Sequence, residues 1–162
     1  MGIERAGHAD IAKQVGVSTA TVFNYFPTRD ALVEAVLDEV EARVIAIFDK
    51  MGPLSDDPEK RILQGAAAYQ RMVEDSPDAV KTFLKWGVSF EPSIRPRYLA
   101  FQRRILDKLT VLLPHSTDPL TEARVLYGAA NSLAVMLFDG ERMELLAGYS
   151  ARMARILAKP DG

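Results

Sequence analysis

The sequence predicts an all-α protein, and two observations support that prediction. Apolar residues recur at helical spacing in segment after segment of the 162-residue chain, and polar and apolar residues nowhere alternate for long enough to indicate a strand. Glycine and proline, several times next to a serine, threonine or aspartate that can cap a helix, separate these segments. We therefore expect helices joined by short turns and no sheet.

Three helices are expected in the first 51 residues. Residues 8–15 form a short helix that Gly16 ends, and Ser18 caps a second helix to about residue 25. Thr28 caps a long third helix to about residue 51. The apolar stripe of this long helix consists of Leu32, Val36, Val40, Val44, Ile47 and Phe48.

Five more helices are expected in the rest of the chain. Aspartate or serine before proline opens a helix at Asp57, Ser76 and Asp118, because proline suits the first helical position. Ser93 is expected to cap the helix between the last two of these starts. The expected ranges are 57–75, 76–87, 93–113, 118–138 and 141–159, the last of them ending near Lys159.

Composition excludes several classes of protein. The chain has no cysteine, which excludes disulfides and cysteine-ligated metal sites, and no apolar run near the ~20 residues that span a bilayer. With 48% hydrophobic and 26% charged residues it can form a core. The formal net charge is −2, so bulk charge does not point to nucleic acid. We expect a cytoplasmic protein that uses no metal or cofactor.

The sequence offers no catalytic grouping. Its two histidines, His8 at the start of the first helix and His115 in an expected loop, do not indicate a paired base and nucleophile. It has neither a phosphate-binding glycine loop nor an H-E-x-x-H zinc motif. We therefore expect that the protein is not an enzyme.

Residues 10–18 have the pattern of a helix-turn-helix. Ala12 is small enough for a second helix to cross close to it, and Gly16 turns the chain. Val17 is expected to fill the gap between the helices, and Ser18 caps the second one. In such a unit the second helix enters the major groove of DNA. The same pattern fits a helical corner inside a bundle, where Ser18 is a cap and nothing more.

The second helix of this unit offers polar side chains for contact with DNA. Hydroxyl groups bond phosphates or bases, methyl groups contact thymine, and Asn24 can pair with adenine through two hydrogen bonds. Val22, Phe23 and Phe26 are expected on the buried side. The candidate DNA-binding residues are Lys13, Ser18, Thr19, Ala20, Thr21, Asn24, Tyr25 and Thr28.

The residues that follow the turn resemble the TetR family of transcriptional regulators. The segment VFNYFPTRDAL, from Val22 to Leu32, is similar to the end of the recognition helix and the start of the next, long helix in that family. The stretch from Gly2 to Val40, with GHADIA and ATVFNYFPTR, is similar to the subgroup of quorum-sensing master regulators related to LuxR and HapR.

This resemblance implies a ligand-responsive homodimer with a role in quorum sensing. Residues 18–25 of each subunit would enter one major groove of a pseudo-palindromic operator, with half-sites roughly 10 base pairs, or a multiple of that, apart. Asn24 would contact a base, and the side chains near phosphates would be Thr19, Thr21, Tyr25 and Thr28. Family members have a further helix, and in this subgroup a basic arm, upstream of Gly2. Without them we expect this chain to bind DNA weakly.

Two domains are expected, a helix-turn-helix domain over 1–45 that is incomplete at its N-terminal side and a ligand-binding and dimerisation domain over 46–162. Aromatic residues gather in the second domain, Phe90 and Phe101 among them, at a spacing that fits either an ordinary core or a cavity. The resemblance favours a cavity for a small apolar ligand. The candidate ligand-binding residues are Tyr69, Phe83, Trp86, Tyr98, Gln102 and Asn131.

The last two helices are expected to pair with their mates across a two-fold axis, although their small residues fit internal packing equally well. The candidate interface residues are Ala130, Leu133, Leu137, Leu146 and Met153. We therefore expect a sequence-specific, ligand-responsive transcriptional regulator. The alternative is a dimeric small-molecule-binding or interaction module that does not bind DNA.

Overall fold

The computed structural model describes residues 7–158, and for residues 14 and 15 it describes the backbone alone. All regular structure in this part of the chain is helical, which confirms the all-α prediction. Gly2, where the stretch that resembles the quorum-sensing subgroup begins, and Lys159, near which the last helix was expected to end, lie outside the described residues. The helices are α1 (His8–Val15), α2 (Thr19–Tyr25), α3 (Arg29–Lys50), α4 (Pro58–Asp75), α5 (Pro77–Gly87), α6 (Arg95–Leu109), the 3-10 helix η2 (Thr110–Leu112), α7 (Pro119–Phe138) and α8 (Met143–Leu157).

Local signals begin and end several helices as expected. Gly16 ends α1 with φ of 73°, in the left-handed region that glycine adopts without a side-chain clash. Ser18 and Thr28 each accept a hydrogen bond from the amide three residues further on, at the starts of α2 and α3. Asp57 and Asp118 cap α4 and α7 in the same way.

The expected cap at Ser93 is wrong. Ile94 is the N-cap residue of α6, and Ser93 is exposed in the turn before it. The amides of Ile94 and Arg95 donate to the carbonyl oxygen of Glu91 at 3.2 and 2.9 Å. The turn therefore leads directly into α6 through backbone bonds, and no serine cap forms.

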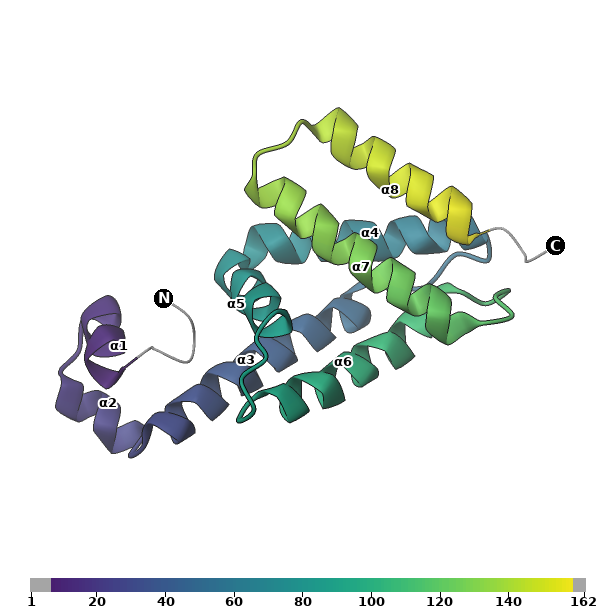
Figure 1. The fold of residues 1–162 in the computed structure, drawn as a ribbon. Coiled ribbons are helices and arrows are strands. Elements are labelled where there is room, and N and C mark those ends of the chain that lie inside the picture. Colours follow the sequence, from purple (N-terminus) through teal and green to yellow (C-terminus); the bar gives the residue numbers. More distant parts are fainter. Residues whose placement is uncertain (1–6, 159–162) are drawn as a thin grey trace.

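The first two helices form a head (residues 8–25) at the end of α3 that lies away from the other helices (Figure 1). The first half of α3 contributes Leu32 to the head, and from Leu37 onward α3 packs into the bundle formed by α4 to α8. The expected domain boundary near residue 45 falls within this continuous helix. The apolar core of the head is small and consists of Ala12, Val22 and Leu32, with Ile11 and Phe26 packed against them.

Two apolar clusters hold the bundle together. The larger cluster contains residues of α3, α4, α5, α6 and α7. It includes Trp86 and Phe101, whose rings stack with centroids 5.9 Å apart. The smaller joins α4, α6, η2, α7 and α8 through residues such as Ile62, Leu112 and Ala154. α7 and α8 run side by side along one edge of the bundle (Figure 1).

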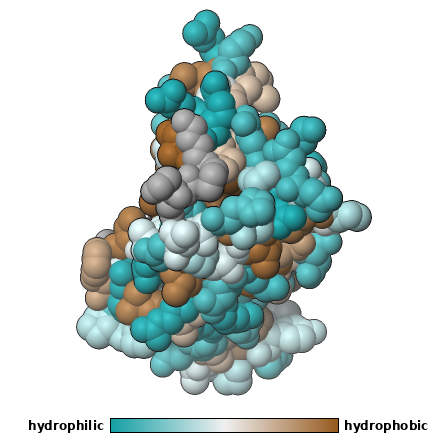
Figure 2. Space-filling model, turned by 90° about the vertical axis from the view of Figure 1, so that its right-hand side faces the viewer, coloured by the Kyte–Doolittle hydropathy of each residue, from teal (hydrophilic) through white to brown (hydrophobic). Residues whose placement is uncertain are grey.

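The end of the bundle where α8 finishes is largely hydrophilic (Figure 2). Hydrophobic residues on this face lie in separate groups between polar ones. Among the helices of residues 7–158, none combines the length and apolar character that crossing a bilayer requires.

Candidate functional site

The helices of the head cross closely, as the helix-turn-helix pattern predicts. Ala12 of α1 is 2% exposed and meets Val22 of α2, which is 5% exposed. The expected role of Val17 is wrong, because this side chain is 43% exposed and does not fill the gap between the helices. Ala12 brings the two helices close enough for Val22 and Leu32 to occupy that gap.

Helix α2 presents most of its side chains to solvent. Thr19, Ala20, Asn24 and Tyr25 are exposed and Thr21 is half-buried, while Val22 is the residue that α2 buries. Two turns of helix therefore offer hydroxyl, amide and phenol groups on an outer surface without any charge of their own. Such a surface can donate and accept hydrogen bonds at base edges.

The assignment of Phe23 to the buried side is wrong. Its ring is 48% exposed and stacks on His8, with centroids 3.9 Å apart and planes 3° from parallel. The Nε2–H of His8 donates to the carbonyl oxygen of Phe26 at 2.7 Å, since a carbonyl only accepts. His8 therefore ties the start of α1 to both the middle and the end of α2. No spacing rule in the sequence indicates this pairing across 18 residues.

Three further candidate DNA-binding residues lie at the edges of this surface. Ser18 and Thr28 are exposed, and their oxygens already accept capping bonds, so the Thr28 hydroxyl has its proton left for another acceptor. Ser18 Oγ also lies 2.8 Å from Thr21 Oγ1. Lys13 is exposed on α1, and Arg29 is exposed at the start of α3. These two cations flank the uncharged α2.

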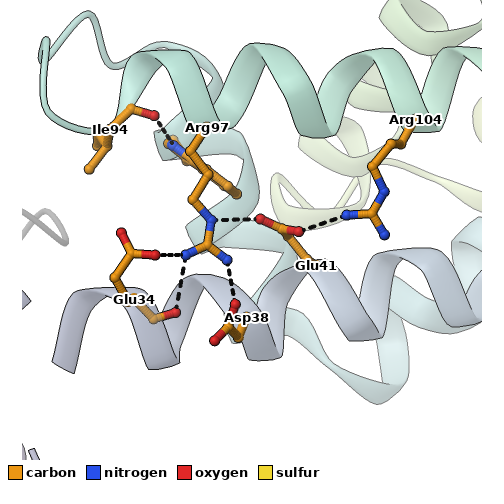
Figure 3. Close-up of polar contacts among 7 residues, drawn as sticks. Glu34, Asp38, Glu41, Ile94, Arg97 and Arg104 are labelled. Atoms are coloured by element: carbon orange, nitrogen blue, oxygen red, sulfur yellow. Dashed lines mark hydrogen bonds and ion pairs between the residues drawn. The ribbon is translucent and has the colours of Figure 1, made fainter. Parts of the chain in front are cut away.

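An ion-pair network fastens α3 to α6 immediately behind the head (Figure 3). Arg97 of α6 reaches three successive turns of α3, contacting Glu34, Asp38 at 2.6 Å and Glu41 at 2.7 Å. Arg104 adds a second contact to Glu41 at 3.0 Å. Burial lowers the pKa of Arg97, but the bonds to these carboxylates outweigh it, so the net pKa is raised. The guanidinium therefore stays charged and fixes the direction in which α3 carries the head.

A small, partly open cavity with a volume of about 80 Å³ lies in the bundle and is lined by residues of α3 to α8. Three of the candidate ligand-binding residues, Tyr69, Phe83 and Asn131, line it. Trp86 does not, because it is 1% exposed within the core and its indole N–H donates to Ile94 O at 3.4 Å. The sequence did not single out Tyr127, Tyr149 and Ser150, which also line the cavity.

The other two candidates lie beside the cavity. Tyr98 lines an open groove between α5 and α7, and its hydroxyl lies 2.6 Å from that of Tyr127. Gln102 donates to Tyr98 Oη at 3.4 Å and lines neither space. Phe90 does not join the aromatic cluster, since it is 77% exposed and packs under the guanidinium of Arg95.

The candidate interface residues on α7 and α8 face inward. Leu133 and Leu146 are 3% and 2% exposed, and Ala130 and Met153 line the internal cavity. Leu137 is half-buried against the larger cluster. The outward faces of these helices carry other residues at helical spacing: Val125, Gly128, Ser132 and Val135 on α7, and Leu145, Gly148, Arg152 and Ile156 on α8.

Taken together, the head has the geometry of a helix-turn-helix unit: a short capped helix with a polar outer surface, braced by a second helix at the tip of the molecule. Within residues 7–158 no group of histidine and acidic side chains is arranged to hold a metal ion.

Comparison with known proteins places this head in a family. Residues 1–36 match the profile of bacterial regulatory proteins, tetR family. The HTH-type transcriptional regulator LuxR of Vibrio harveyi is 34% identical over 102 residues, which are 63% of this chain and 50% of that protein. The nucleoid occlusion factor SlmA is 38% identical over 45 residues in Haemophilus influenzae (28% of this chain, 21% of that protein) and 42% over 43 residues in Pasteurella multocida (26% and 22%).

Residues 1–36 therefore have the sequence of the tetR family of bacterial regulatory proteins, and 63% of the chain is similar to a regulator. These matches confirm the resemblance to the TetR family seen in the sequence. The matched segment spans half the length of LuxR and about a fifth of SlmA.

Proposed function

We propose that the chain is a sequence-specific DNA-binding transcriptional regulator that inserts α2 into the major groove. The outward polar surface of α2 carries this proposal, because a helix that buries little more than Val22 is not packed as a corner inside a bundle. Asn24 is the base-reading residue, since its amide can donate to and accept from adenine at once. Thr19, Thr21, Tyr25 and Thr28 hold the register through phosphates, and Lys13 adds electrostatic attraction.

The regulator acts as a homodimer on a pseudo-palindromic operator. The outward face of α7 and α8 is the interface, because it combines exposed apolar side chains such as Val135 (47%) and Ile156 (50%) with the exposed Gly128 and Gly148. A Cβ added at either glycine would meet no atom within 4 Å, so a partner helix can approach closely there. A two-fold axis through this face gives two heads for two half-sites.

A small molecule that binds in the internal cavity modulates DNA binding. The protein acts in the cytoplasm, where the operator is. The cavity lies between α3, which carries the head, and α7 and α8, which form the interface. A ligand in the cavity that favours one arrangement of α3 therefore changes the spacing of the two heads in the dimer. The likeness to LuxR supports a place in quorum sensing.

Selection from a library of random duplexes tests the proposal. We expect enrichment of a palindromic site, bound with a preference over random duplex at about 50 mM salt, where even weak binders are measurable. Asn24→Ala should lower affinity for that site by ~1–3 kcal/mol and relax the preference at one position. Gln70→Ala on α4, remote from the head, is the matched control and should leave both unchanged.

Failure to enrich any site would refute DNA recognition by this chain. Retained dimerisation and small-molecule binding in that case would favour the alternative, a dimeric ligand-binding module. Equal loss of affinity in Asn24→Ala and Gln70→Ala would show that α2 does not read the sequence.

A further inference from the structure

The lining of the internal cavity restricts the charge of its occupant. Every residue that lines it is uncharged, and most are aliphatic or aromatic. A charged ligand would lose its hydration without gaining an opposite charge, which is a large cost in an apolar interior. The occupant is therefore a neutral molecule.

The polar groups of the lining differ in whether they are already satisfied. Tyr127 Oη lies 2.6 Å from Tyr98 Oη, and Tyr149 Oη donates to the carbonyl oxygen of Ala129 at 3.2 Å. Tyr69 is 8% exposed, and its hydroxyl is buried without a hydrogen-bond partner among the described residues. Buried hydroxyls in proteins are nearly always hydrogen-bonded, so this one is an exception that a ligand can resolve.

The unsatisfied group acts as a donor. Burial, and secondarily the neighbouring Tyr127, raise the pKa of Tyr69 well above its ordinary value, so the phenol keeps its proton at any physiological pH. A protonated phenol offers one O–H to an acceptor. The matching ligand atom is an oxygen or nitrogen with a lone pair.

We propose that this cavity binds a compact, uncharged, mainly apolar molecule with one acceptor oxygen, such as a ketone or ester carbonyl, and that Tyr69 donates the hydrogen bond that anchors it. The proposal rests on the proposed ligand response and names the ligand class and the anchoring residue. The groove between α5 and α7 shares Phe83, Tyr127 and Asn131 with the cavity, so these side chains border both spaces.

Two probes of matched shape test the anchoring bond. Cyclopentanone has a carbonyl, and methylenecyclopentane has a CH₂ group in its place. Their affinities are measured by NMR titration of amide shifts in the wild-type chain, in Tyr69→Phe and in Tyr149→Phe. Comparing changes between the probes cancels the different hydration of the two molecules. Cyclopentanecarboxylate serves as the charged probe.

We expect Tyr69→Phe to weaken cyclopentanone binding roughly two- to tenfold, the range for one hydrogen bond, and to leave methylenecyclopentane binding unchanged. Cyclopentanecarboxylate should not bind. Tyr149→Phe should leave the ratio of the two affinities as it is in the wild type, because the hydroxyl of Tyr149 is already used.

Stability of the free protein gives a second readout. Tyr69→Phe removes a hydroxyl that has no partner, so the melting temperature should stay the same or rise. Tyr149→Phe removes the hydrogen bond that the Tyr149 hydroxyl donates to Ala129 O, so the melting temperature should fall.

Three outcomes would overturn the proposal: no binding of either neutral probe, an equal effect of Tyr69→Phe on both probes, or tight binding of the carboxylate. None of them involves DNA. Failure of operator recognition would leave this test intact, and failure here would leave operator recognition intact.

Discussion

Replacing Arg97 with glutamine should destabilise the fold by about 2 kcal/mol, with the Glu41 contact as the main source. Glu41 is 15% exposed and Arg97 21%, so their 2.7 Å contact is a sheltered, charge-assisted hydrogen bond of ~1.5–3 kcal/mol. Glu34 and Asp38 are 57% and 75% exposed, and such pairs contribute ~0–1 kcal/mol each. Arg104 still contacts Glu41 in the variant, which keeps the loss at the lower end.

Urea denaturation monitored by circular dichroism measures this change. Arg103→Gln is the matched control, because Arg103 is exposed on the same helix and forms no ion pair with any residue of the described range 7–158. Raising the salt concentration should reduce the stability lost in Arg97→Gln to the contribution of the Glu41 contact, because salt screens the exposed pairs with Glu34 and Asp38 more strongly. Arg97→Lys should recover only part of the stability, because an ammonium cannot span three carboxylates as a guanidinium does. Equal midpoints for Arg97→Gln and Arg103→Gln would refute the reasoning.

Three further outcomes are expected. His8→Ala should loosen the head by about 2 kcal/mol, through loss of one part-buried hydrogen bond and one ring stack, and so speed hydrogen exchange of the α2 amides; unchanged exchange would contradict that role. Val135→Glu should convert a dimer to a monomer in light scattering, whereas Val111→Glu, at a 50% exposed site on η2, should not; equal behaviour would place the interface elsewhere. Lys13→Ala should weaken binding to all duplexes alike and lower the salt slope by about 1, and a sequence-dependent loss would instead assign Lys13 to a base.

Helix positions and the helix-turn-helix could be predicted because their causes are local in sequence. Ser18, Thr28, Asp57 and Asp118 cap the amide three residues on, so the signal and its effect lie within one turn of helix. Gly16 ends α1 through its own backbone conformation. The polar surface of α2 followed from its composition, and of the buried residues expected there Val22 was confirmed.

The tertiary structure decided which side of an apolar helix faces the core. α7 carries apolar or small residues around most of its circumference, so its periodicity does not separate Leu133, which is buried, from Val135, which is exposed. The choice of Leu133 for the interface came from this ambiguity. Only the positions of the neighbouring helices resolve it.

The tertiary structure also decided which polar groups are satisfied. His8 meets Phe23 and Phe26, and Arg97 meets residues about 60 positions earlier, through folding that no local pattern encodes. The hydroxyl of Tyr69 has no hydrogen-bond partner among residues 7–158, whereas that of Tyr149 donates to Ala129 O. A hydrogen bond depends on a few tenths of an ångström and on direction, and these are set when distant helices pack, not by the spacing of residues along the chain.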